Sequence, residues 1–241
     1  IQDFRFYKGV AKYTSDFVVP STSPDIHPDT PSGVAGGSKL AKITDGAVSF
    51  DGSDDNLLAG QSEDYNFGTG SWTIECFAYF NNNTSGQDIT DFTNNSSATG
   101  DPGGQLYFSS SASQGLAWYQ SSTYYAKTTT APIIPKKWLH IAVVKNSSGD
   151  TIKIYIDGKE EGSSSHSESA GTNAGDLRIG LQGSTYFNGS ISNLRVVKGT
   201  AVYTSNFTPP IAPLTNVTNT KLLTCQSPNN VKSSTIGPTI G

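Results

Sequence analysis

The chain has 241 residues, a formal net charge of −4, and charged side chains at only 15% of its positions. This acidic balance argues against a nucleic-acid partner, because such a surface needs clustered Lys and Arg. We also expect no membrane insertion, since no apolar run approaches the 18 or so residues of a spanning helix. Two cysteines, Cys76 and Cys225, are too few for a disulfide framework, and whether they pair is left open.

The first twenty residues contain a phrase that recurs near the end of the chain. KGVAKYTSDFVVP (8–20) reappears as KGTAVYTSNFTPP (198–210), and the match extends back to Ile1 and Ile191. Self-similarity at a fixed, domain-sized spacing indicates an array of domains. We therefore predict the end of a preceding copy plus a linker at 1–30, one domain at 31–226, and a linker or the start of a following unit at 227–241.

Strand signals begin at Ala47, after a stretch rich in Pro, Gly and Ser at 21–39. AVSFDGSDDNLLAG (47–60) predicts two short strands around a polar turn. SWTIECFAYF (71–80) is the clearest strand, because strict alternation places Trp72, Ile74, Cys76, Ala78 and Phe80 on one apolar face. The opposite face carries Glu75 and two aromatic residues, Phe77 and Tyr79, and we interpret it as a half-covered surface or a docking place.

The middle of the chain predicts several aromatic strands after a long polar loop at 81–105. LYFSS (106–110), GLAWYQ (115–120) and STYYAKTTT (122–130) come first, followed by strands at 138–145 and 151–156. Asp157-Gly158 then favours a type I′ hairpin turn. Two strands within 176–199 and a short one at 221–225 complete the series. Many short strands separated by turns predict an all-β sandwich or barrel.

The order of these phrases resembles a known family. VSFDGSDDNL, FGTGSWTIECFAYF, WLHIAVVKNSSGDTIKIYIDGKEEGS and LRIGLQGSTYFNGSISNLRVVKG follow one another as in the laminin-G-like branch of the concanavalin A-like lectin/glucanase superfamily, over about residues 45–210. The resemblance implies a jelly-roll sandwich of two antiparallel sheets. The closing phrase (191–210) is similar to the end of tandem copies in phage and aquatic bacterial surface proteins, which implies an extracellular or virion location and other copies or virion proteins as partners.

The closing phrase also has a physical interpretation. Tyr203 and Phe207 are four residues apart, a spacing that would let both pin one short helical turn onto the sheet. Pro209 and Pro210 would then end that turn. We expect the aromatic pair to serve packing.

Catalytic chemistry has little support in this sequence. Glycosidases need two carboxyl groups facing the substrate bond, whereas the best candidate strand offers only Glu75, and the Glu-x-Asp-x-x-Glu pattern of the glucanase relatives does not occur. The three histidines, His27, His140 and His166, have no metal-ligand or nucleophile spacing. We expect a protein that is not an enzyme.

Calcium is the cofactor that the sequence leaves open. The turn DGSDDN gathers four oxygen-bearing side chains, Asp51, Asp54, Asp55 and Asn56. Ca²⁺ takes six to eight such oxygens, and related lectin-like domains often hold calcium. Asp and Asn are also ordinary turn residues, so a ligand-free turn is the alternative. Asp88, Asp91 and Asp101 form a weaker candidate.

An aromatic cluster in the middle third predicts a glycan site. Tyrosines and a tryptophan gather there with amide neighbours, and the candidate ligand-binding residues are Tyr107, Trp118, Tyr124, Gln105 and Gln120. Alternation places Trp118 and Tyr119 on opposite faces, so only part of the cluster can share a surface. The alternative is that these are ordinary strand aromatics.

The sequence therefore favours a non-enzymatic structural or adhesion protein of a virion or cell surface, such as a tail fibre, appendage or capsid decoration, with a host-surface glycan as its candidate ligand. Two alternatives stay open. One is a carbohydrate-binding module attached to a secreted enzyme, and the other is a structural spacer or assembly domain with no ligand.

Overall fold

The computed structural model describes residues 8–9, 46–93, 103–110, 115–128, 133–171, 176–227, 229–238 and 240–241. The chain divides into two units, Ile1–Ile43 and Thr44–Gly241, and every strand below belongs to the second. The expected preceding copy and its linker lie outside the described residues except for Lys8 and Gly9, as do His27 and Asp101. The domain boundaries given above stay predictions.

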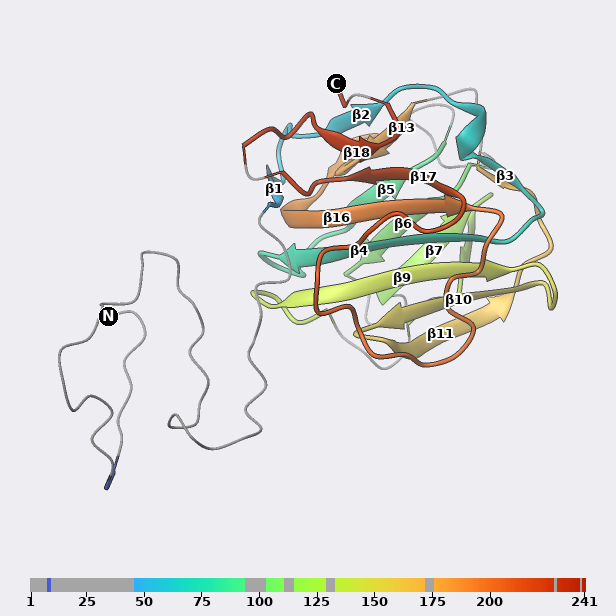
Figure 1. Cartoon of the computed structure of the whole chain (residues 1–241), viewed down its shortest axis with the longest axis horizontal. Coiled ribbons are helices and arrows are strands. Elements are labelled where there is room, and N and C mark those ends of the chain that lie inside the picture. Colours follow the sequence, from blue (N-terminus) through green and yellow to red (C-terminus); the bar gives the residue numbers. More distant parts are fainter. Residues whose placement is uncertain are drawn as a thin grey trace. The chain divides into compact units, whose positions relative to one another are not determined.

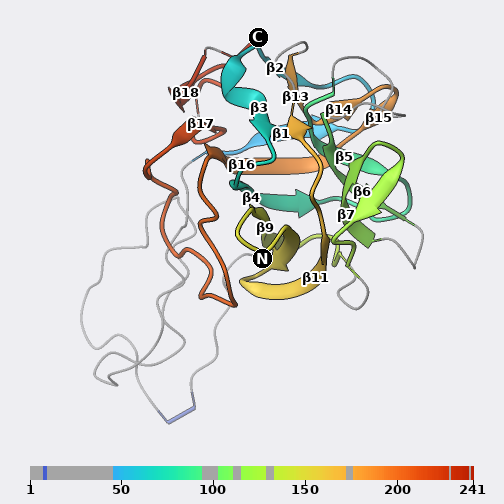
Figure 2. The same ribbon diagram turned by 90° about the vertical axis from the view of Figure 1, so that its right-hand side faces the viewer.

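The second unit contains two large antiparallel sheets that pack face to face (Figures 1 and 2). The first has eight strands, in the order β11 (Lys159–Ser165), β10 (Thr151–Ile156), β9 (Trp138–Asn146), β4 (Trp72–Phe80), β16 (Asn188–Lys198), β17 (Thr220–Thr224) and β18 (Ser234–Ile236), with β1 (Val48–Asp51) also paired to β16. Strand β4 thus lies in the centre of the sheet, between β9 and β16.

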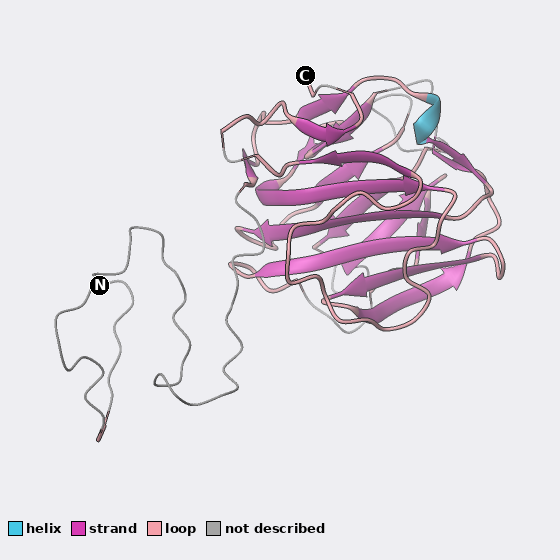
Figure 3. Ribbon diagram, in the orientation of Figure 1, coloured by secondary structure: helices cyan, strands magenta, loops and turns pink. Residues whose placement is uncertain are grey.

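The second sheet has six strands, in the order β2 (Leu57–Ala59), β13 (Leu177–Ile179), β5 (Gln87–Asp91), β6 (Gln105–Ser109), β7 (Gly115–Gln120) and β8 (Thr123–Tyr125). Two small pairs complete the unit, β3 (Asn66–Gly68) with β12 (Ala170–Gly171) and β14 (Leu181–Gln182) with β15 (Thr185–Tyr186). The single helix among the described residues is the 3-10 turn η1 (Glu63–Tyr65) (Figure 3). The predicted all-β sandwich of two antiparallel sheets is confirmed.

The core lies between the two sheets and follows the predicted alternation of β4. Trp72, Ile74, Cys76, Ala78 and Phe80 are all fully buried. Trp72 contacts Trp118 of β7 in the opposite sheet, with 4.7 Å between the ring centroids. Cys76 and Cys225 are both buried, and both are free thiols.

The predicted hairpin at Asp157-Gly158 is also present. The two residues join β10 to β11 with φ angles of 48° and 78°, the positive values that a type I′ turn requires. A side chain at position 158 would collide with the carbonyl oxygen of Phe207, because an ideal Cβ there lies 1.9 Å from that atom. Gly158 therefore serves both the turn and the close approach of another segment.

That segment is the connection between β16 and β17, residues 199–219, which we call the strap. It crosses the outer face of the eight-stranded sheet, in front of β4, β9 and β10 in Figure 1. Tyr203 and Phe207 of the strap stack with ring centroids 3.6 Å apart, and they pack against a buried cluster that includes Tyr155. The packing role of this aromatic pair is confirmed.

The expected helical turn at Tyr203 and Phe207 is wrong, because residues 199–219 contain neither helix nor strand. The strap is held by bonds to the sheet instead. The backbone N–H of Phe207 donates to the carbonyl of Gly158 (2.9 Å), and the backbone N–H of Glu160 donates to the side chain of Asn206 (2.9 Å). Because the N–H of Phe207 donates to the hairpin, it does not form a hydrogen bond within a helix of the strap.

Among the described residues, no helix is both long and apolar enough to cross a membrane.

Candidate functional site

The outer face of the eight-stranded sheet holds a buried polar network centred on Glu75. Its Oε1 accepts from Arg195 Nε (3.0 Å) and Nη2 (2.5 Å), and its Oε2 accepts from His140 Nε2 (3.1 Å) and from the Tyr203 hydroxyl (2.9 Å). Arg195 also donates to the carbonyl of Thr215 in the strap (2.6 Å). The network therefore fastens the strap to the middle of the sheet.

Burial alone would raise the pKa of Glu75. The hydrogen bond from His140 and the charge of Arg195 outweigh that effect and hold the pKa below its ordinary value. The carboxylate is thus ionised, fully buried and saturated with donors. The sequence left open whether this face of β4 is a half-covered surface or a docking place. In the structure, the strap docks on it.

The outer face of the six-stranded sheet presents a different surface. Residues directly opposite each other in an antiparallel pair share a face, and the register runs Arg178–Asp91–Gln105–Tyr119–Tyr124 across five strands. Leu106, Phe108, Leu116 and Trp118 alternate with these positions and belong to the core. The row therefore faces away from the core.

Three tyrosines of this face form what we call the tyrosine cluster: Tyr107, Tyr119 and Tyr124. Tyr124 lies 4.6 Å from Tyr119 and 6.3 Å from Tyr107 between ring centroids, and all three side chains are half-buried. An ideal Cβ at Gly86 would lie 2.2 Å from the Tyr107 hydroxyl. The glycine at position 86 therefore leaves the space that this ring occupies over the start of β5.

Asp88 lies next to the tyrosine cluster, opposite Tyr107 in the register. It is fully buried, and neither of its carboxyl oxygens has a hydrogen-bond partner in the structure as described. The buried Oε1 of Gln105 likewise has none. Burial, and after it the charge of Asp91, raise the pKa of Asp88 well above its ordinary value. Unsatisfied buried acceptors are rare in folded proteins, and ligand sites are one place where they occur.

Asp91 is the neighbouring carboxyl group and is fully partnered. Its Oδ1 accepts from the backbone N–H of Thr93 (2.8 Å), and its Oδ2 accepts from Arg178 Nη1 (3.1 Å). Burial raises the pKa of Asp91 to about 6, with Thr93 and Arg178 opposing the rise. The face thus combines an ion pair, an isolated carboxyl group and three aromatic rings.

The structure divides the expected glycan site and corrects two of its members. Tyr107, Tyr124 and Gln105 lie on the outer face, whereas Trp118 and Gln120 point inward and are 0% and 1% exposed. Trp118 Nε1 donates to Gln120 Oε1 (2.8 Å), which also contacts His166 (2.9 Å). Trp118 lies opposite the buried Leu106 across the β6–β7 ladder. Gln120 is two residues further along β7 and shares the inward face with Trp118.

Sequence reasoning missed Tyr119, Asp88 and Arg178 as members of this face. The alternation that separated Trp118 from Tyr119 was the available signal for Tyr119. Asp88 gave no such signal, because a spacing of three places Asp88 and Asp91 on opposite faces of a regular strand. A register shift between Asp88 and Thr90 brings both carboxyl groups to the outer face.

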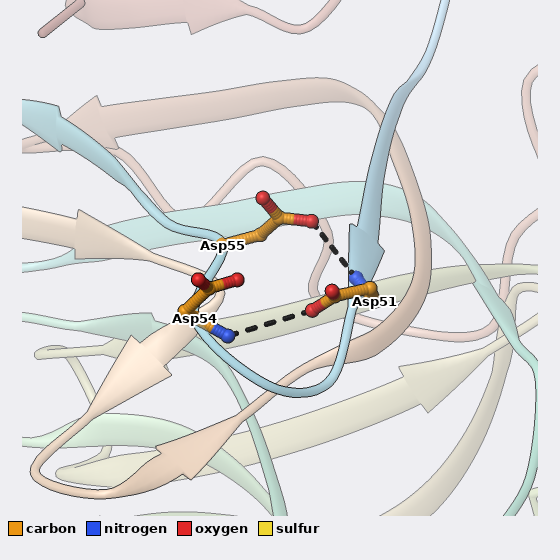
Figure 4. Close-up of side chains that lie close together, drawn as sticks. All are labelled: Asp51, Asp54 and Asp55. Atoms are coloured by element: carbon orange, nitrogen blue, oxygen red, sulfur yellow. Dashed lines mark hydrogen bonds between the residues drawn. The ribbon is translucent and has the colours of Figure 1, made fainter.

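The predicted calcium turn forms an acidic group at the end of β1 (Figure 4). Asp51, Asp54 and Asp55 each offer an oxygen within 4.8 Å of the others, and all three are exposed. Asp51 Oδ1 accepts from the backbone N–H of Ser53 (2.7 Å), and Asp55 Oδ2 accepts from that of Asp51 (3.0 Å). Asn56 donates to the carbonyl of Asp54 (3.5 Å). The carboxylates fit a hard cation, and they also serve as turn-forming side chains.

Three solved structures are similar to this chain. A candidate carbohydrate-binding protein from Bacteroides ovatus has a TM-score of 0.59 and 15% identity, and the match covers 83% of this chain and 59% of that one. The native heptameric SAP-like pentraxin from Limulus polyphemus has a TM-score of 0.47 and 17% identity, over 66% and 78% of the two chains. The CBM40 of the Ruminococcus gnavus IT-sialidase has a TM-score of 0.48 and 12% identity, over 68% and 95%.

At these identities, the similarity to the Bacteroides protein shows the fold alone, and the chain spans 59% of that protein's length. No curated protein matches the sequence. A family profile described as "Concanavalin A-like lectin/glucanases superfamily" matches residues 51–202, which is more than half of the chain. The protein therefore belongs to the laminin-G-like branch of the concanavalin A-like lectin/glucanase superfamily.

Proposed function

We propose that the unit Thr44–Gly241 is a carbohydrate-binding module that holds a glycan on the outer face of its six-stranded sheet. The observation that carries this proposal is the tyrosine cluster beside two buried acceptors without partners, Asp88 and Gln105 Oε1. Ligand sites typically join aromatic surface to a few convergent polar groups. A sugar ring matches both: its apolar face stacks on tyrosine, and its hydroxyls donate to the acceptors once the tyrosine side chains shift, because both acceptors are buried in the structure.

The Bacteroides ovatus protein, a candidate carbohydrate-binding protein with the same fold, gives this proposal general support. The network around Glu75 favours binding over hydrolysis on the other sheet, because its one buried carboxylate is committed to Arg195, His140 and Tyr203. The isolated carboxyl of Asp88 favours a ligand over a structural spacer, since a spacer has no use for it.

We further propose that the module serves attachment, as a surface or virion protein with a host glycan as its partner. The support is the closing phrase, which is similar to those of tandem surface proteins. A carbohydrate-binding module attached to a secreted enzyme is the alternative, and the sequence that adjoins this domain in the full protein distinguishes the two.

Replacing Tyr124 with alanine is expected to lower glycan binding about ten-fold or more, because Tyr124 contacts both other rings of the cluster and buried aromatic anchors dominate binding energy. Wild type and Tyr124→Ala would be compared on a glycan array and then by calorimetry with the strongest ligand. The matched control is Tyr79→Ala, because Tyr79 is a half-buried tyrosine of the other sheet. This variant should bind glycans as tightly as wild type does. A wild-type protein that binds nothing on the array would overturn the proposal.

Calcium binding at Asp51, Asp54 and Asp55 is a separate proposal, supported by their mutual distances. A bound ion stabilises the folded state by about 2.7 kcal/mol at a hundred times its Kd. Adding a chelator to calcium-loaded protein is therefore expected to lower the melting temperature by several degrees. Asp54→Asn removes one ligand charge and should abolish the shift. Identical melting curves for wild type with chelator and with calcium would refute the proposal.

A further inference from the structure

Asp88 has no structural function that the described contacts reveal. Both of its oxygens are buried without a hydrogen bond, and the charge that acts on it belongs to another acid, Asp91. An unpartnered buried carboxyl group destabilises the folded state. Proteins retain such groups chiefly where a ligand uses them. Asp88 is therefore the residue of this face whose presence most needs a ligand to explain it.

The charges around the tyrosine cluster are unfavourable for an acidic sugar. The groups that face Asp88 are Asp91, Tyr107 and Tyr124, together with Arg178 through its bond to Asp91. Arg178 is the only basic residue in the six strands of this sheet, and its guanidinium is already paired with Asp91. A sialic or uronic acid would bring a third acidic group to a face whose single cation is already paired.

An uncharged sugar is not repelled by the acidic groups of this face. Asp88 and Gln105 Oε1 are acceptors without donors, and a pyranose ring carries adjacent hydroxyl groups that donate. Two hydroxyls on neighbouring carbons match the two oxygens of one carboxylate. The tyrosine rings beside them supply the apolar contact.

We propose that this site selects neutral sugars over acidic ones and that Asp88 is the residue that determines the selection, by accepting hydrogen bonds from ligand hydroxyls. The proposal rests on the proposed function and specifies its ligand class. It also predicts a conflict between stability and binding at one position. Removing the carboxyl group should raise the stability of the ligand-free protein and lower its affinity for the glycan.

The test compares wild type with Asp88→Asn on an array that carries neutral, sialylated and uronic-acid-containing oligosaccharides. Wild type is expected to bind neutral spots at least ten-fold more tightly than acidic ones, and Asp88→Asn to lose at least ten-fold on the neutral spots. Asp64→Asn alters a half-exposed acid on η1 that pairs with Lys221. It is the matched control and should leave the array pattern unchanged.

Thermal melts of the same proteins supply the second measurement. Because the folded-state pKa of Asp88 is raised, the wild type loses stability as the pH rises above the ordinary value of 3.8. Asp88→Asn should therefore melt at or above the wild-type temperature at pH 7, and the difference should vanish below pH 3.8. A lower melting temperature for Asp88→Asn at pH 7 would give Asp88 a structural role and overturn the inference.

The array results separate the two proposals. If wild type binds glycans, Tyr124→Ala loses them and Asp88→Asn keeps them, the binding function stands and the role of Asp88 is wrong. Preference of wild type for acidic spots overturns the selectivity in the same way. If wild type binds no glycan on the array, both the proposed function and this inference are wrong.

Discussion

Replacing Glu75 with alanine is expected to lower the free energy of unfolding by about 3–5 kcal/mol, because the substitution leaves the buried Arg195 guanidinium without its counter-ion. The hydroxyl of Tyr203 and the ring of His140 lose their acceptor at the same time. Urea denaturation followed by tryptophan fluorescence measures the effect. A change in the midpoint at constant slope would show loss of stability rather than of two-state behaviour.

Glu160→Ala provides the control for Glu75→Ala. Glu160 also forms an ion pair, with Lys153 (2.8 Å), but both side chains are partly exposed, at 33% and 27%. Pairs of this kind contribute about 0–1 kcal/mol. If Glu75→Ala is no more damaging than Glu160→Ala, the network does not fasten the strap in the way the contacts imply.

Trp118→Ala is expected to destabilise the protein by about 3–5 kcal/mol, since a large buried side chain is lost and a cavity remains. The ring contacts Trp72 and Phe92, with centroids 4.7 Å and 6.1 Å away, so the cavity opens at the junction of the two sheets. Gln120 also loses the hydrogen bond that its Oε1 accepts from Trp118 Nε1. Calorimetric melting at a fixed pH measures the change.

Tyr119→Ala is the natural comparison, because Tyr119 follows Trp118 in the chain and points to the opposite face of β7. Its removal is expected to change stability by about 0.5 kcal/mol while weakening glycan binding. The opposite result would contradict this assignment of the outer face of β7. In that case Trp118→Ala would keep its stability but lose glycan binding, and Tyr119→Ala would change neither stability nor binding.

These two aromatic neighbours illustrate what the sequence could and could not predict. The alternation along β4, the positive-φ turn at Asp157-Gly158 and the order of the strands were all readable, because each depends on local spacing. Which side of β7 faces the core depends on its register with β6, where Trp118 lies opposite Leu106. That pairing depends on tertiary structure and cannot be read from the spacing of residues in β7. The choice of Trp118 for the ligand face was therefore reasonable but incorrect.

Two further features depend on contacts that no short pattern encodes. The irregularity at Ile89 turns Asp88 to the same side as Asp91, and strict alternation would have separated them. Glu75 bonds to Arg195 of β16 and to Tyr203 of the strap, which lie 120 and 128 residues further along the chain. From the sequence alone, a strand face with a carboxylate and two aromatic residues resembles an open surface, because the distant partners of Glu75 are not visible there.

The central place of β4 has a kinetic consequence for a chain made from its N-terminus. Glu75 meets His140 across a separation of 65 residues and Arg195 across 120, and long-range strand pairing is slow to form. At the usual speed of translation, the last of these partners leaves the ribosome on the order of 10 s after β4 does. During that interval β4, which contributes five fully buried side chains to the core, has at most one of its two neighbouring strands. This makes β4 a segment on which we expect a chaperone to act.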